Sequence, residues 1–192
     1  GKILAVWAYI RGIPYVLIIT HLPHTDATRI EFLNKHGPRL REAIITQVAK
    51  TKSGRWPAIM RMSDDNFCMN PQLDHTPSSS QGHPLSNAAL TTFLSLLTPK
   101  GMRDVYRICE PDGRATTFQR RGTPGSAPVS CRYDVIHLSN DLTNDICKPA
   151  RTYHRSPDDT MVHYIHKNVR TAKSSDHSQV CLFYTSPSPR DY

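Results

Sequence analysis

Three apolar runs of the sequence each carry a carboxylate near one end, and the last also carries a histidine. Ile59-Met60-Arg61-Met62 leads into Ser63-Asp64-Asp65-Asn66, a second run contains Arg132-Tyr133-Asp134, and Ser175-Asp176-His177 precedes a third. Strand ends that deliver carboxylates and an amide can hold a hard divalent cation and a phosphate oxygen. Asp and Asn also favour turns, so each tip alone fits an ordinary turn. The three tips together favour a site for phosphoester chemistry.

The elements that position these tips begin with two β-rich runs at residues 3–10 and 15–20. Arg11-Gly12-Ile13-Pro14 joins them, which predicts an antiparallel hairpin. Both runs are mostly apolar, so we expect a sheet that is covered on both faces. The second run ends at His21, with His24 three residues later. That spacing in a Pro-containing loop suits a zinc pair poorly, and we favour a single functional histidine, His21.

Two helices are expected to lie on the sheet. The segment from Thr25 to Val48 has a helical period, with Gly37-Pro38 expected to interrupt or restart it. Residues 70–86 lack a period and are rich in Pro, Ser, His and Gly, which predicts a long surface loop beside the Asp64 tip. A second helix is expected from Ser86 to about residue 97, and Gly101 ends it.

A basic tip is predicted between strands at residues 116–118 and 129–138. Arg120 and Arg121 in this tip suit a DNA groove, where guanidinium groups meet a strong negative potential. A solvated basic turn fits the same residues equally well. Arg132, just before Asp134, is also assigned to DNA contact.

The bulk composition fits one basic domain. The 192 residues include 24 Lys and Arg against 16 Asp and Glu, which gives a net charge of +8. This charge suits a nucleic-acid partner, although many basic proteins have no such partner. The five cysteines are dispersed, without a C-x-x-C pair, which favours a reducing compartment. No apolar stretch is long enough to cross a bilayer, so no membrane partner is expected.

The two ends of the chain are predicted to differ from an ordinary domain. The first residue is Gly1 rather than Met, so we expect the chain to begin within a longer protein. Residues 181–192 resemble the translation of a sequencing-library adaptor and are interpreted as a non-native tail. The domain is therefore assigned to residues 1–180.

Taken in order, the motifs resemble those of the endonuclease/exonuclease/phosphatase superfamily. Ser63-Asp64-Asp65-Asn66 sits where the family has Gly-Asp-Phe-Asn, Cys131-Arg132-Tyr133-Asp134 sits at Ser-Arg-Ile-Asp, and Ser175-Asp176-His177 at the closing Ser-Asp-His. Asn70-Pro71-Gln72-Leu73-Asp74 and Asp104-Val105-Tyr106-Arg107 are similar to the endonuclease domains of non-LTR (LINE-type) retrotransposons. The resemblance runs from Gly1 to about Val180.

The resemblance implies a four-layer α/β sandwich, in which two packed, mostly antiparallel or mixed β-sheets are flanked by helices. It also implies that the fold is incomplete at the N-terminus. The family's metal-binding Glu and first Asn lie on strands that would precede Gly1.

The resemblance further implies catalytic roles. His177 would take a proton from the attacking water or stabilise the transition state, and Asp134 would accept from its other ring nitrogen. Asn66 would donate to a phosphate oxygen, and His21 would contact the phosphate. Asp64 would orient the water or join the metal shell. The implied metal is Mg²⁺, or Mn²⁺, with Asp176 beside it.

Two positions depart from the family pattern. Ser63 replaces the usual Gly, which would strain the turn if a positive φ is required there. Asp65 replaces an aromatic residue and puts a second carboxylate beside Asp64, so like-charge repulsion is expected to raise one of the two pKa values. These departures leave open a catalytically inactive, DNA-binding remnant.

The sequence thus predicts a Mg²⁺-dependent phosphodiesterase that nicks DNA, as in a retrotransposon endonuclease. A reverse transcriptase region is expected in the same parent polypeptide, with an intracellular location and access to the nucleus. A phosphoinositide or sphingolipid phosphoesterase of the same fold is the other alternative, which the basic balance and the arginine tip argue against.

Overall fold

A computed structural model describes residues 1–10, 12–51, 54–76, 83–114, 116–120 and 129–142 of the chain. In chain order the elements are β1 (Lys2–Ile10), β2 (Ile13–His21), α1 (Asp26–Lys50), β3 (Ala58–Asp64), α2 (Pro71–Asp74), β4 (His75–Thr76), α3 (Pro84–Leu97), β5 (Met102–Asp104), α4 (Val105–Cys109), β6 (Phe118–Arg120), β7 (Val129–Cys131) and β8 (Asp134–Ser139). Among these residues, no helix is both long and apolar enough to cross a membrane.

The strands form two sheets. A five-stranded sheet has the order β1-β2-β3-β8-β5, and a three-stranded sheet has the order β4-β7-β6. All neighbours are antiparallel except β2 and β3, which run parallel because α1 crosses between them. The predicted hairpin is confirmed as β1 and β2, and the mixed α/β class is confirmed with it.

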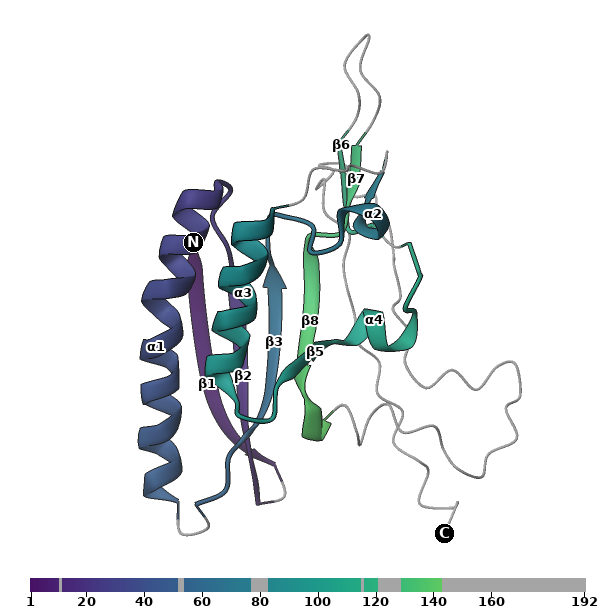
Figure 1. Cartoon of the computed structure of the whole chain (residues 1–192). Coiled ribbons are helices and arrows are strands. Elements are labelled where there is room, and N and C mark those ends of the chain that lie inside the picture. The colour runs from purple at the N-terminus through teal and green to yellow at the C-terminus, as the bar shows by residue number, and fades with distance from the viewer. Residues whose placement is uncertain (11, 52–53, 77–82, 115, 121–128, 143–192) are drawn as a thin grey trace, which may run out of the picture.

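Helices α1 and α3 pack side by side on one face of the large sheet (Figure 1). The core between them and the sheet is made of apolar side chains from β2, β3 and both helices: Val16, Ile18, Ile59, Leu33, Ile44, Leu90, Phe93, Leu94 and Leu97. The burial of this face stabilises the layer, at roughly 25 cal/mol per Å² of apolar surface. Of the four expected layers, the described residues give this helix layer and the five-stranded sheet, with the small sheet beyond the ends of β3 and β8 (Figure 1).

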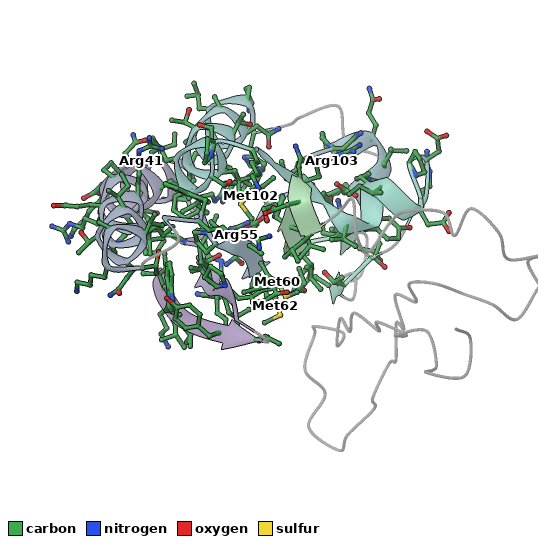
Figure 2. The ribbon with its side chains drawn as sticks, turned by 90° about the horizontal axis from the view of Figure 1, so that it is seen from below. Arg41, Arg55, Met60, Met62, Met102 and Arg103 are labelled. Atoms are coloured by element: carbon green, nitrogen blue, oxygen red, sulfur yellow. The ribbon has the colours of Figure 1, made fainter. Side chains whose placement is uncertain are left out.

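The opposite face of the large sheet remains open at its β1 side. Leu4 is 55%, Val6 43% and Ile19 41% exposed. Figure 2 shows Met60 and Met62 on the same side of the sheet, away from the two helices. The expectation that both faces of the hairpin are covered is therefore wrong for the described chain, because both long helices lie on one face.

Helix α1 runs without a break through Gly37-Pro38, where an interruption was expected. Pro38 removes one backbone donor from the helix. Packing against α3 outweighs that loss: a Cβ on Gly37 would lie only 3.1 Å from Leu96 Cδ1, so the glycine allows the two helices to approach closely. One turn later, Arg41 Nη1 donates to the Leu96 carbonyl at 3.1 Å, at the C-terminal end of α3.

The strand expected from Val129 to Leu138 is two strands, β7 and β8, which belong to different sheets. Residues 132–133 between them leave the strand ladder. Tyr133 N and Asp134 N both donate to Thr117 Oγ1 at 3.0 Å, and Asp65 N donates to the Tyr133 carbonyl at 2.8 Å. This turn sets Asp134 at the start of β8.

Candidate active site

Three of the sequence-predicted residues lie in a row at one end of the large sheet. His21 ends β2, Asp64 ends β3 and Asp134 begins β8. The register pairs His21 with Asp64 and Asp64 with Asp134 on adjacent strands. Parallel strands present their C-terminal ends at the same edge, and the antiparallel β8 contributes its N-terminal end there. The sheet thus brings together residues that are far apart in the sequence.

Asn66 joins this row from the loop after β3. Its Nδ2 donates to the Leu22 carbonyl at 2.7 Å and lies 3.5 Å from His21 Nε2. Its backbone N donates to Asp64 Oδ1 at 3.1 Å, and His21 Nε2 lies 3.5 Å from Asp64 Oδ2. The side chains of His21 and Asp64 are 47% and 20% exposed. The cluster is therefore hydrogen-bonded and open to a ligand from solution.

The departure at Ser63 has no backbone cost. Ser63 lies within β3, and its hydroxyl accepts from Thr20 Oγ1 at 2.8 Å. Among the described non-glycine residues, positive φ occurs at Asn66, at 54°, a conformation that Asn tolerates better than most residues. The predicted strain at Ser63 is therefore wrong, because the left-handed residue comes three positions later.

Asp65 does not compete with Asp64 for the same space. Its carboxylate is buried, and it pairs with the buried Arg61 guanidinium and accepts from the Ser63 hydroxyl. Burial raises the pKa of Asp65, but the Arg61 charge outweighs this effect and holds the pKa below its usual value. For Asp65, the expectation that repulsion from Asp64 raises the pKa is therefore wrong, because Arg61 neutralises its carboxylate.

His137 on β8 completes this buried group. Arg61 Nη1 lies 3.2 Å from His137 Nδ1. An arginine only donates, so Nδ1 accepts and the ring proton sits on Nε2. Burial, and then the charge of Arg61, lower the pKa of His137 to about 4. The imidazole is therefore neutral at physiological pH.

Acid is expected to destabilise the protein through His137. Its pKa is about 4 when folded and near 6.5 when unfolded, so between these values the unfolded chain binds more protons. The free energy of unfolding should fall by about 3 kcal/mol as the pH drops through this window. Urea unfolding at several pH values measures the fall. His137→Asn keeps an acceptor for Arg61 without the titrating ring, and an unchanged pH slope in that variant would contradict the assignment.

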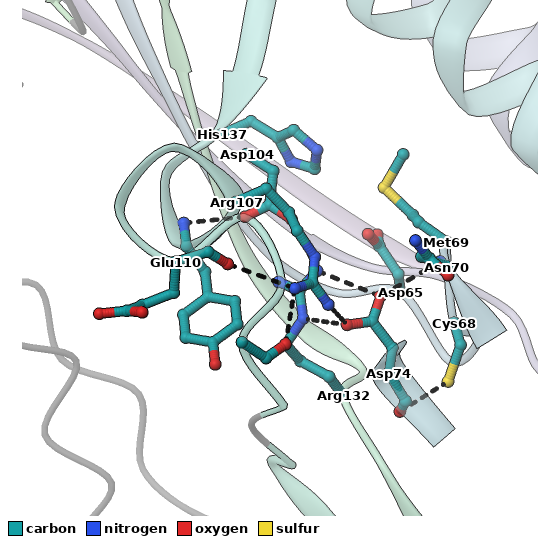
Figure 3. A network of polar contacts seen from close by, with 12 residues as sticks. Asp65, Cys68, Met69, Asn70, Asp74, Asp104, Arg107, Glu110, Arg132 and His137 are labelled. Carbon is teal, nitrogen blue, oxygen red and sulfur yellow. Dashed lines mark hydrogen bonds and ion pairs between the residues drawn. The ribbon is translucent and has the colours of Figure 1, made fainter. Parts of the chain in front are cut away.

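Arg132 is inside the protein rather than at a DNA-binding surface. It is 2% exposed. Its Nε donates to Asp74 Oδ1 at 2.8 Å, and its Nη2 donates to Asp104 Oδ2 at 2.6 Å. Arg107 also pairs with Asp74 (Figure 3). The predicted DNA contact of Arg132 is therefore wrong, because its guanidinium is used to join α2, β5 and the turn before Asp134.

The remaining predicted residues cannot be placed in the site. Arg120 ends β6, but its side chain is not among those described. Arg121, Asp176 and His177 lie outside the described residues, as do the third apolar run and the tail at 181–192. Their roles stay predictions.

No protein-family model matches the chain, and no curated protein matches it. Solved structures do. An AP endonuclease from Archaeoglobus fulgidus is 19% identical with a TM-score of 0.58, over 91% of this chain and 62% of that chain. The 3'-5' exonuclease NExo from Neisseria meningitidis is 15% identical with a TM-score of 0.55, over 91% and 62%. A 3' phosphatase NExo from Neisseria, bound to a product DNA hairpin, is 15% identical with a TM-score of 0.52, over 95% and 65%.

The chain has the endonuclease/exonuclease/phosphatase fold. This confirms the fold class predicted from the sequence motifs. The chain spans less than two thirds of the length of each of these three structures. The narrower resemblance to LINE-type endonucleases is a separate question, because these identities are too low to select a subgroup.

The donor chemistry of the row fits a hard cation. Within the described ranges, no group of three or more His, Cys, Asp or Glu side chains could hold a metal ion. Asp64 and Asp134 are register partners, however, and Mg²⁺ commonly binds through one or two carboxylates and keeps several waters. The carboxylates of Asp64 and Asp134 are on register partners of neighbouring strands, where like charges repel each other, so a cation bound beside them would be stabilising. Among the described residues, Asp64 therefore supplies one carboxylate that suits Mg²⁺ or Mn²⁺, with Asp134 on the neighbouring strand.

Sequence reasoning missed the residues that support the site. Arg29, Arg61 and Asp74 are all buried and all paired with opposite charges. A signal existed for the two arginines. Arg61 interrupts an apolar strand, and Arg29 starts the buried stripe of α1 that continues at Leu33. Nothing in the sequence pattern indicated the partners of Asp74, which are distant in the chain.

Proposed function

We propose that the chain is part of a Mg²⁺-dependent phosphodiesterase that nicks DNA, as a non-LTR retrotransposon endonuclease does. The observation that carries the proposal is the row of His21, Asp64 and Asp134 at one end of the sheet, with Asn66 beside it, in a fold that nucleases share. From the resemblance in the sequence, we also propose a reverse transcriptase region in the same parent polypeptide.

The proposed chemistry assigns a role to each of these side chains. Hydrolysis of a phosphodiester needs a deprotonated water, neutralised phosphate oxygens and a stabilised leaving oxygen. His177 would accept the water proton, and Asp134 would fix its tautomer. Asp64 would orient the water, while Asn66 and His21 bind phosphate oxygens. Bound Mg²⁺, held by Asp64 and Asp176, would supply positive charge at the phosphate.

DNA is the proposed substrate for two reasons. The net charge of +8 favours a polyanion. One of the similar structures, the Neisseria phosphatase, was solved with a product DNA hairpin. Arg120 and Arg121, in the basic segment that the sequence places between β6 and β7, would supply contacts to the DNA backbone.

The rival hypotheses have less support. The inactive remnant rested on Ser63, Asp65 and the strands that the resemblance places before Gly1. Of these, Ser63 has a regular place in β3 and Asp65 pairs with Arg61 in the buried network. No described feature favours a lipid phosphoester over DNA. The catalytic proposal is therefore preferred.

The test is relaxation of supercoiled plasmid. The domain is produced together with the upstream segment that the family resemblance implies, which would carry the metal-binding Glu. With Mg²⁺ it should convert supercoiled plasmid to the open circular form, and chelation of the metal should stop the reaction. His177→Ala should abolish nicking, whereas the control His36→Ala, on α1, should not. Nicking that survives His177→Ala would remove that residue from its role, and no nicking by the unmodified domain would contradict the proposal.

A further inference from the structure

Arg29 lies in the first turns of α1, and its side chain is 1% exposed. Arginine has five N–H donors. All five are used: Nε donates to the Pro23 carbonyl at 3.1 Å, Nη1 to Asp26 Oδ1 at 2.8 Å and Ser86 Oγ at 3.0 Å, and Nη2 to the carbonyls of His24 at 2.6 Å and Asn66 at 3.2 Å. No donor is left for a substrate, so Arg29 cannot itself bind phosphate in this arrangement.

The three carbonyls belong to the two loops that carry the candidate site. Pro23 and His24 follow directly on the end of β2 at His21, and Asn66 is in the loop after β3. The loops are also joined directly, since Asn66 Nδ2 donates to the Leu22 carbonyl. Arg29 thus ties both loops to α1 from the buried side, opposite to the exposed His21.

The hydrogen bond from Arg29 to the Asn66 carbonyl stabilises an unusual backbone conformation. Its φ of 54° is unfavourable for an L-residue unless its surroundings hold it. Arg29 holds the carbonyl on one side of Asn66, while the Asp64 carboxylate accepts from the amide N on the other. With both ends held, the amide side chain of Asn66 is directed towards His21.

The guanidinium is itself fixed by its surroundings. It lies 4.6 Å from the centre of the Phe67 ring, a cation–π contact in the core. Asp26 and Ser86 hold its Nη1 edge, and the Ser86 hydroxyl also donates to Asp26 Oδ1 at 2.6 Å. Arg29 therefore transmits the fixed position of α1 and α3 to the two loops.

We propose that Arg29 is a positioning residue of the candidate site. Its guanidinium fixes the Asn66 backbone and the loop after His21, so that the side chains of Asn66 and His21 can contact the same phosphate. The proposal rests on the proposed function for its catalytic consequence, but the positioning itself does not. Lysine has three donors, so in Arg29→Lys at least two of the five acceptors lose their hydrogen bond to residue 29.

The positioning is tested first without any activity, on the 192-residue chain. In the unmodified protein, ¹⁵N spectra should show slowly exchanging Arg29 Nε–H and separate Nη–H signals, because every donor is engaged. Arg29→Lys should shift the amide signals of Leu22, His24, Asn66 and Phe67. The matched control is Arg41→Lys. Arg41 also lies on α1, and its carbonyl contact is with Leu96, at the other end of α3 from Ser86. This variant should leave those signals in place. Averaged Arg29 signals, or unshifted loop signals in the Lys variant, would overturn the proposal.

The catalytic consequence is tested on the nicking domain at a temperature where circular dichroism shows each variant fully folded. Arg29→Lys should lower kcat about 10²-fold, the scale of loss for a small misplacement of catalytic groups, with KM for plasmid nearly unchanged. Arg41→Lys should keep both constants. An unchanged kcat would overturn the proposal, as would a loss confined to KM. If the unmodified domain does not nick, the proposed function fails while the spectra still decide whether Arg29 positions the loops.

Discussion

Asp74→Asn should lower the free energy of unfolding by about 3–5 kcal/mol, the usual cost of removing one partner from a buried ion pair. Asp74 is fully buried and is the shared partner of Arg107 and Arg132. Figure 3 shows the two guanidinium groups converging on its carboxylate. The asparagine keeps the shape of the side chain but removes its charge. In the native protein, Asp74 Oδ2 accepts from Arg132 Nη2 and, at 3.1 Å, from the backbone N of Asn70. An NH₂ group in that place cannot accept either hydrogen bond.

Urea unfolding of the 192-residue chain measures this loss. The control is Asp141→Asn, which breaks a pair with Lys100 whose side chain is 48% exposed. A partly solvated pair of this kind contributes less than about 1 kcal/mol. Equal losses in the two variants would mean that the Asp74 network is not the buried anchor that its geometry indicates.

Asp134→Asn should slow plasmid nicking by about 10²–10⁴-fold, the range that a positioned acid or base contributes to a reaction. The substitution removes the charge that would orient His177 and accompany Mg²⁺, but it leaves the backbone N of residue 134 bonded to Thr117 Oγ1. The fold should therefore survive, and the loss should appear in kcat.

The matched control is Asp112→Asn, which removes one exposed carboxylate from the loop after α4. It should nick at the rate of the unmodified domain. A variant at Asp134 that also nicks at that rate would place the reaction elsewhere on the molecule.

The sequence was sufficient to predict that His21, Asp64 and Asp134 come together. His21 and Asp64 each end an apolar β-rich run, and Asp134 begins one. When such runs pair in a sheet, residues at their ends come to the same edge of the sheet. The hairpin followed from its turn residues for the same local reason. What is local in the chain, such as period and turn chemistry, was predicted well.

Features that depend on distant partners were predicted poorly. Arg132 was assigned to DNA, because its partners Asp74 and Asp104 come from segments that only the fold brings near. Asp65 was assigned as a neighbour of Asp64, although Arg61, four residues earlier, was available on the same side of the chain to neutralise it. Pro38 was expected to break α1, whereas packing between Gly37 and α3 keeps the helix whole.

The single parallel pair, β2 with β3, also sets an order of assembly. The β1–β2 hairpin closes a short loop and can form early, whereas β3 can pair with β2 only after the whole of α1 has crossed over the sheet. β8 must then arrive from still further along the chain. Contacts between such distant segments form slowly. The candidate site would therefore be among the last parts of the molecule to form. On the proposed function, a newly made chain would not nick DNA until folding was nearly finished.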